Sequence, residues 1–191
     1  MDRFYLPAIR NASVVTPMFD MIASLYDAFT DTTVNLATAS LLLEAVLVHA
    51  PSGAPILDFG CGTGVAVGAL KLLGSEARLL GVDVSTGMLS RAQQRGLSVI
   101  SIESWRSAPP QVGGAIANFV LHYGVPDDDL ARIARSLLPG SVFCANLFGA
   151  EPDILAKTVQ VLTACGLVHD RKFPIARPIK PDLMLSFRKP S

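Results

Sequence analysis

The spacing of hydrophobic positions changes along the chain. From Pro17 to Phe29 apolar residues recur every three to four positions, which predicts an amphipathic helix. The stretch from Thr33 to His49 predicts a second helix that is apolar on most sides, as buried or oligomeric helices are. From Pro55 onward short apolar runs alternate with helical patterns. We therefore expect a helical segment over residues 1–50 and a domain over residues 51–191.

The second part of the chain alternates between predicted strands and predicted helices. The strands are expected at 55–59, 78–82, 97–102, 115–121, 141–148, 168–175 and 183–188, and the helices at 65–73, 88–95, 127–138 and 153–165. This alternation is typical of an α/β domain whose mostly parallel sheet carries helices on both faces. Only a proline-rich turn at 177–181 separates the last two strands, so they should pair antiparallel at one edge.

Composition and charge narrow the function. The chain has 191 residues, with 16 Lys and Arg against 16 Asp and Glu, and this zero formal charge argues against a nucleic-acid partner. No stretch resembles a signal peptide or a good membrane span. The three cysteines and the three histidines are scattered, which fits a reducing compartment and indicates no metal site. We expect a cytoplasmic protein without a membrane partner.

The first strand of the predicted sheet runs directly into a glycine-rich turn. Asp58 is followed by Gly60, Gly62 and Gly64 at alternate positions, just before a helix. Glycines in this place let a nucleotide lie against the backbone. The next strand ends at Asp83, 19 residues after Gly64, where a carboxylate can accept both hydroxyls of a ribose. Asp83 could instead only cap the following helix.

The charge of Asp58 indicates which nucleotide the turn would bind. A carboxylate beside the turn repels the pyrophosphate of a dinucleotide and attracts a cation. S-adenosylmethionine carries an ammonium and a sulfonium, together with an adenosine whose ribose hydroxyls are free. Asp58, the glycines and Asp83 match this pattern. Alternatively, Asp58 only accepts hydrogen bonds from nearby backbone amides.

Two stretches of the sequence resemble the class I S-adenosylmethionine-dependent methyltransferase family. They are Leu57-Asp58-Phe59-Gly60-Cys61-Gly62-Thr63-Gly64 and Gly81-Val82-Asp83-Val84-Ser85-Thr86-Gly87-Met88-Leu89. The resemblance continues at 118–123 and 137–141, and it covers about residues 53–148. It implies a single-domain Rossmann-like methyltransferase fold with a seven-stranded sheet in the order 3-2-1-4-5-7-6, strand 7 antiparallel. It also implies S-adenosyl-L-methionine as the cofactor.

The resemblance implies roles for individual residues as well. Around the methionine part of the cofactor it places Asp58, Gly60, Cys61, Gly62, Gly64 and Asn118. Asp83 would hold the ribose, while Val84 and Met88 would flank the adenine. Glu103 and Ser104 follow the third strand, where the family has an acid near the adenine, although the match slips there by about one residue.

Residues 1–50 are expected to cover this site as a helical lid. Tyr26-Asp27 resembles the Tyr-Asp of lid helices in small-molecule methyltransferases, so Tyr26 could cap the methyl-transfer site or simply pack its ring. His122 follows the fourth strand, and it could act as a general base or only shape the pocket. The acidic run 127–129 is expected to open a helix, with Asp127 as its cap, rather than to bind metal.

The sequence thus predicts a methyltransferase that acts on a small apolar or aromatic metabolite. A second interpretation is a methyltransferase fold that binds the cofactor but catalyses a cyclisation or rearrangement, because fold does not fix function. A third is a partner-binding subunit, and a nicotinamide dehydrogenase is disfavoured by Asp58. The apolar N-terminal helices could also join two copies into a homodimer.

Overall fold

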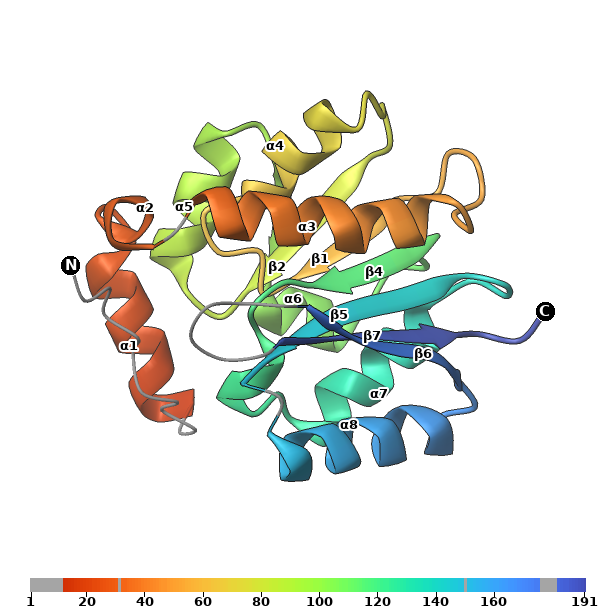
Figure 1. The fold of residues 1–191 in the computed structure, drawn as a ribbon. Helices are drawn as coiled ribbons and strands as arrows, with labels where there is room; N and C mark the ends of the chain where they lie inside the picture. The colour runs from red at the N-terminus through yellow and green to blue at the C-terminus, as the bar shows by residue number, and fades with distance from the viewer. Residues whose placement is uncertain (1–11, 31, 150, 176–181) are drawn as a thin grey trace.

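The computed structural model describes residues 12–30, 32–149, 151–175 and 182–191. They contain a seven-stranded sheet in the order β3-β2-β1-β4-β5-β7-β6, with helices on both faces (Figure 1), as expected. Strands β1 to β5 are parallel, and β7 is antiparallel to both β5 and β6. The strands are β1 (Ile56–Phe59), β2 (Leu79–Asp83), β3 (Ser98–Ser101), β4 (Gly114–Ala117), β5 (Val142–Phe148), β6 (Val168–Ile175) and β7 (Asp182–Arg188).

Two apolar cores lie on the two faces of this sheet. Successive strand residues point to opposite faces, so Ile56 packs in one core and its neighbour Leu57 in the other, both fully buried. The first core lies under α3 (Thr32–Leu47), α4 (Val65–Leu72) and α5 (Thr86–Gln94). The second lies under α6 (Ile102–Ser107), α7 (Asp127–Ser136) and α8 (Pro152–Ala164). Strands buried on both faces explain the short, nearly continuous apolar runs of the sequence.

Parallel pairing brings the carboxyl ends of three strands to the same edge of the sheet. Asp58 pairs in register with Gly81 of β2 and with Ile116 of β4. The chain order reverses at this point, because β2 and β4 lie on opposite sides of β1. The crevice at such a reversal is where open α/β sheets bind their ligands.

The N-terminal segment differs from the single helix that we predict over 17–29. It forms α1 (Ala12–Ile22) and the short α2 (Tyr26–Phe29), which are separated by a turn. Ala23, in that turn, is buried beside Gly87 of α5, where an added β-carbon would lie 3.1 Å from the Ala23 β-carbon. The helix breaks so that this segment can follow the surface of α5. Residues 1–11 of the expected lid lie outside the described residues.

Two further boundaries differ for local reasons. The fourth strand ends at Ala117 rather than 121, because Phe119 adopts a left-handed φ of 57° and donates its N–H to the Asn146 side-chain oxygen at 2.6 Å. The third strand ends at Ser101, whose hydroxyl accepts the Ser104 N–H and caps the unexpected helix α6. The turn predicted at 177–181 lies outside the described residues. Within the described chain, no helix combines the length and the apolar character that a membrane crossing needs.

Candidate cofactor and substrate site

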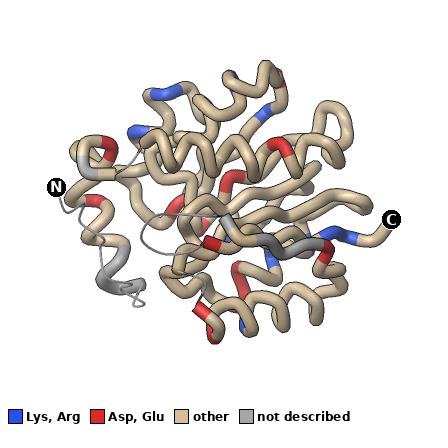
Figure 2. Tube along the Cα trace, in the orientation of Figure 1, with Lys and Arg blue, Asp and Glu red and all other residues tan. Residues whose placement is uncertain are grey.

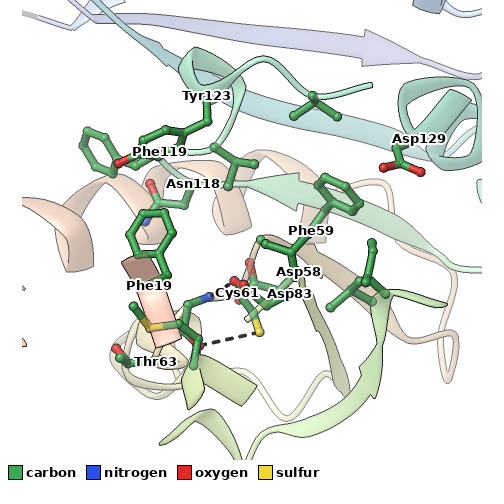
Figure 3. A pocket seen from close by; sticks show the side chains of 18 of the residues that line it. Phe19, Asp58, Phe59, Cys61, Thr63, Asp83, Asn118, Phe119, Tyr123 and Asp129 are labelled. Atoms are coloured by element: carbon green, nitrogen blue, oxygen red, sulfur yellow. Dashed lines mark hydrogen bonds between the residues drawn. The ribbon is translucent and has the colours of Figure 1, made fainter. Parts of the chain in front are cut away.

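A pocket opens at the carboxyl ends of β1, β2 and β4 (Figure 3). Strand ends and the glycine turn form one side, and aromatic side chains from α1, α2 and the 118–126 segment form the other. The structure brings together most of the residues that the sequence proposed for the site. Those that line the pocket are Tyr26, Asp58, Gly60, Cys61, Gly62, Asp83, Val84, Met88 and Asn118.

Two carboxylates give the pocket its electrostatic character. Asp58 is only 2% exposed, and burial, followed by repulsion from Asp83, raises its pKa to about 7. Burial also raises the pKa of Asp83, although its two oxygens accept the Gly62 N–H at 2.8 Å and the Ser85 N–H at 2.9 Å. The two acids are neighbours, and burial disfavours the charged form of each. A cationic ligand would therefore stabilise the site.

The glycine turn leaves room where a ligand would have to approach. Gly62 has a φ of 51°, and an added β-carbon there would meet no heavy atom within 4 Å. Gly60 also has a positive φ, but its β-carbon would overlap Val120. The two positions therefore serve different purposes: Gly60 permits packing against the 118–126 segment, and Gly62 faces open space in the pocket.

We expect Gly62→Ala to weaken ligand binding by more than its loss of stability explains. The change forces an L residue into a left-handed backbone, at a cost of roughly 1–2 kcal/mol, and it fills space at the turn. Gly53→Ala is a matched control, because Gly53 has a φ of 78° and open surroundings away from the pocket. Chemical denaturation should show similar losses for both variants, whereas calorimetry with S-adenosylhomocysteine should show weakened binding for Gly62→Ala alone. Equal affinities would mean that Gly62 serves only the turn.

Four of the proposed residues do not line the pocket. Gly64 is the N-cap of α4 and packs against Ala92, so it supports the turn from behind. Glu103 is exposed on α6, and Ser104 is tied to Ser101. The pocket instead receives Ile102 and Arg106 from that helix. The unforeseen cap at Ser101 begins a helix, which turns Glu103 away from the strand direction that the sequence suggested.

His122 is the fourth residue outside the pocket wall. It lies in the 3₁₀ turn η1 (Leu121–Tyr123), 9% exposed, and its ring centre is 4.1 Å from that of Tyr123 and 5.7 Å from that of Phe148. Its Nδ1 is buried and has no hydrogen-bond partner among the described residues. Burial lowers its pKa to about 4, so the imidazole is neutral near pH 7. Its ring contacts that of Tyr123, which does line the pocket.

Aromatic rings form the wall opposite the carboxylates. Phe19 of α1 packs edge-on against Tyr26, with ring centres 5.9 Å apart, and against Tyr123 at 5.4 Å. Figure 3 shows Phe19 near Asn118 and Phe119, on the side of the pocket away from Asp58 and Asp83. Burial raises the pKa of Tyr26, and it raises that of Tyr123 to about 12, so both phenols keep their protons. This wall is apolar, with hydroxyl groups that can donate hydrogen bonds.

An ion pair between Arg106 and the buried Asp129, which sequence reasoning missed, lines another part of the pocket. Asp129 is 2% exposed and accepts hydrogen bonds from Arg106, with Nε at 2.9 Å and Nη2 at 2.6 Å. We expected Asp127 to cap α7; the structure places Pro126 at the cap, and Asp127 pairs with Lys157 at 2.8 Å. The run of three acids gave no sign that Asp129 turns inward. A signal was present in its position, because Asp129 lies one helical turn before the buried Ile133.

Asn118 presents an unsatisfied acceptor at the end of β4. Its Nδ2 donates to the Asn35 carbonyl oxygen at 3.1 Å, which fixes the amide on α3. Its Oδ1 is buried and has no hydrogen-bond partner in the part of the chain that the structure describes. A buried acceptor without a partner is costly, so this oxygen would gain from a ligand that brings an N–H or O–H group.

Comparison with known sequences matches this chain to methyltransferases. A family model for a methyltransferase domain matches residues 56–140. The chain is 31% identical, over 137 residues, to the trans-aconitate 2-methyltransferase of Methylobacterium nodulans; the match covers 68% of this chain and 50% of that protein. The chain spans half or less of the length of the first curated relatives it matches.

Solved structures share the fold over almost the whole chain. The Burkholderia thailandensis 1,6-didemethyltoxoflavin-N1-methyltransferase, solved with its substrate and S-adenosylhomocysteine, aligns with a TM-score of 0.69 and 22% identity, covering 100% of this chain and 94% of that one. The [4+2]-cyclase SpnF aligns with a TM-score of 0.73 and 17% identity, covering 92% and 95%. At these identities the likeness establishes the fold.

Proposed function

Because the chain belongs to the class I S-adenosylmethionine-dependent methyltransferase family, we propose that it transfers a methyl group to a small, apolar or aromatic metabolite. The observation that carries this proposal is the pairing of two buried carboxylates with an aromatic wall across one pocket. The carboxylates suit a cationic cofactor. The aromatic wall suits an uncharged, planar acceptor.

The residues present fit the cofactor at each of its parts. Asp58 and the buried Asn118 oxygen are acceptors for an ammonium, Asp83 is placed for ribose hydroxyls, and Met88 offers an apolar surface to the adenine. When bound, S-adenosylmethionine supplies an activated methyl group whose leaving group is a neutral thioether. The protein then has to align the acceptor and exclude water, and alignment of this kind can lower a barrier by several kcal/mol.

The aromatic wall favours an uncharged acceptor. Among the described lining residues the only Lys or Arg is Arg106, and its hydrogen bonds to Asp129 hold it there. A polycarboxylate would therefore meet Asp58 and Asp83 without a free cation opposite. Phe19 and Tyr123 offer the faces and edges on which an aromatic ring can pack. No nucleic-acid partner is proposed, since Lys and Arg are scattered along the trace among acidic positions (Figure 2).

Tyr26 and His122 have different roles in this proposal. Tyr26 lines the pocket beside Phe19 as a protonated phenol, so it can donate a hydrogen bond to an acceptor oxygen or nitrogen. His122 does not line the pocket, but its ring contacts that of Tyr123 and supports it. A proton released by the acceptor would pass to water, since His122 does not line the pocket.

We expect His122→Asn to retain most of the turnover and to raise KM severalfold, because Tyr123 loses the ring that contacts it. At S-adenosylmethionine concentrations that saturate the enzyme at every pH, so that the ionisation of Asp58 does not enter, the wild-type rate should be flat from pH 6 to 9, since burial holds the pKa of His122 near 4. Rate–pH profiles of the two proteins under limiting chemistry check this. A wild-type inflection near pH 6–7 that vanishes in the variant, with turnover lowered about a hundredfold or more, would instead identify His122 as a general base.

An untargeted search for methylated products tests the proposed reaction while the acceptor is still unidentified. The protein is incubated with a metabolite extract and methyl-deuterated S-adenosylmethionine, and products that gain a deuterated methyl group are sought by mass spectrometry. Asp83→Ala serves as the inactive control. If the wild type binds S-adenosylhomocysteine but forms no labelled product, the proposal of methyl transfer is contradicted, whereas the proposal of cofactor binding still stands.

The cyclase resemblance supports a second candidate function. The fold also matches SpnF over 92% of this chain, so the same pocket could bind the cofactor and catalyse a rearrangement. The two functions differ in stoichiometry. Methyl transfer releases one S-adenosylhomocysteine for each product, whereas a rearrangement releases none.

A further inference from the structure

Two acids of the N-terminal helices bind the two ends of α5. Asp20 of α1 accepts the Ser85 hydroxyl at 2.6 Å and the Gly87 N–H at 3.0 Å, at the amino end of α5. Asp27 of α2 pairs with Arg95, at the carboxyl end of the same helix. We call α1 and α2 together the lid. It is attached to α5 at both ends of that helix.

The contact made by Asp27 extends into the glycine turn. Its second oxygen accepts the Thr63 hydroxyl at 2.7 Å, and Arg95 also donates to that hydroxyl at 3.2 Å. Thr63 is 1% exposed and lies between Gly62 and Gly64 of the turn. The neighbouring Tyr26 and the preceding Phe19 line the pocket. Asp27 thus joins the turn on one side of the pocket to the aromatic wall on the other.

The contacts of Asp20 and Asp27 are all made to residues of the same chain. We infer that Asp20 and Asp27 are latch residues that hold the lid closed over the cofactor site, so that the cofactor enters and leaves only when both contacts break. This inference rests on the proposed cofactor site. If only the open form accepts the cofactor, the observed association rate is the intrinsic rate multiplied by the fraction of molecules that are open.

The rates of cofactor exchange test the latch. We expect the double variant Asp20→Ala/Asp27→Ala to bind S-adenosylhomocysteine with an association rate constant at least about fivefold above wild type, and to release it faster as well. Stopped-flow measurement of Trp105 fluorescence can follow both rates, because Trp105 packs against Phe59 of the pocket with ring centres 5.2 Å apart. Asp153→Asn, which removes one charge from an exposed acid on α8, is the control for a loss of negative charge away from the lid and should leave both rates unchanged.

A steric variant opens the same contact without removing a charge. Gly87 lies outside the pocket, and an added β-carbon would lie 3.1 Å from the Ala23 β-carbon and 3.2 Å from the Asp20 carbonyl oxygen. Gly87→Val should therefore push α1 away from α5 and raise the association rate as well. This variant decides the question if the double variant does not fold.

The outcomes separate the latch from the function on which it rests. Failure of the wild type to bind S-adenosylhomocysteine would overturn the proposed cofactor site. Binding with a faster release but an unchanged association rate in the variants would show that the acids only stabilise the bound state, which overturns the latch. Faster association in both the charge and the steric variants supports it.

Discussion

Asp58→Asn is expected to weaken S-adenosylhomocysteine binding by about thirtyfold while stabilising the ligand-free protein at pH 8. The loss follows from removing a charge-assisted hydrogen bond to the ligand ammonium, a bond worth roughly 1.5–3 kcal/mol. The gain follows from burial, because the ionised Asp58 carboxylate is desolvated and is also repelled by Asp83. Calorimetric titration and urea unfolding measure the two effects separately.

The sign of the stability effect depends on pH. The pKa of Asp58 rises from 3.8 to about 7 on folding, so its contribution favours the folded state below pH 4 and is lost as the pH rises through 7. At about 1.4 kcal/mol per pH unit, the loss that accumulates between pH 4 and pH 7 reaches about 4.5 kcal/mol as an upper bound. Asp58→Asn should remove this dependence, whereas Asp153→Asn should keep it. An unfolding free energy equal to wild type at pH 8 would contradict the burial argument.

Ligand affinity should follow the same titration in the wild type. Only ionised Asp58 attracts an ammonium, so binding should strengthen by about tenfold between pH 6 and pH 8 and level off above that. Asp58→Asn should flatten this profile. A wild-type affinity that is constant across this range would separate Asp58 from the cofactor.

Asp83→Ala is expected to lower cofactor affinity by about a hundredfold with little change in the thermal midpoint. The variant loses two hydrogen bonds to ribose hydroxyls, each worth roughly 1.5–3 kcal/mol. In the free protein, two effects oppose each other. The Gly62 and Ser85 amides lose their acceptor, but a carboxylate whose pKa is raised by burial is also removed.

The conservative Asp83→Asn variant separates the ligand contact from the turn. Its amide oxygen can still accept one backbone N–H, so the turn should hold while one ribose acceptor is lost, and affinity should fall by an intermediate factor. Differential scanning fluorimetry and calorimetry on both variants measure stability and binding. Wild-type affinity in Asp83→Ala would remove Asp83 from the cofactor site.

The sheet and one half of the site could be predicted from the sequence. The run around Leu57 is apolar because β1 is buried on both faces, and Asp58 and Asp83 stand out because acids rarely end such strands without a partner. Their common edge follows from parallel pairing. The carboxylate side of the pocket is therefore encoded locally, within a few residues of each strand end.

The aromatic half of the site could not be predicted in the same way. Phe119 turns inward because Asn146, 27 positions later, accepts its N–H and holds a left-handed φ. Glu103 lies away from the pocket because a serine cap begins α6 just before it. The turn between α1 and α2 packs against Gly87, more than 60 positions further along the chain. Each depends on a long-range contact or on a cap, neither of which changes the hydrophobic period.

The contacts between the N-terminal helices and α5 also set an order of events during synthesis. Asp20 and Asp27 emerge from the ribosome before their partners Ser85, Gly87 and Arg95, which lie 65 to 68 positions later. Contacts across such separations form only after the intervening chain is ordered. The N-terminal helices must therefore wait, with apolar side chains uncovered, until α5 is complete. Translation speed across residues 30–95 sets how long this nascent segment is exposed to aggregation or to chaperones.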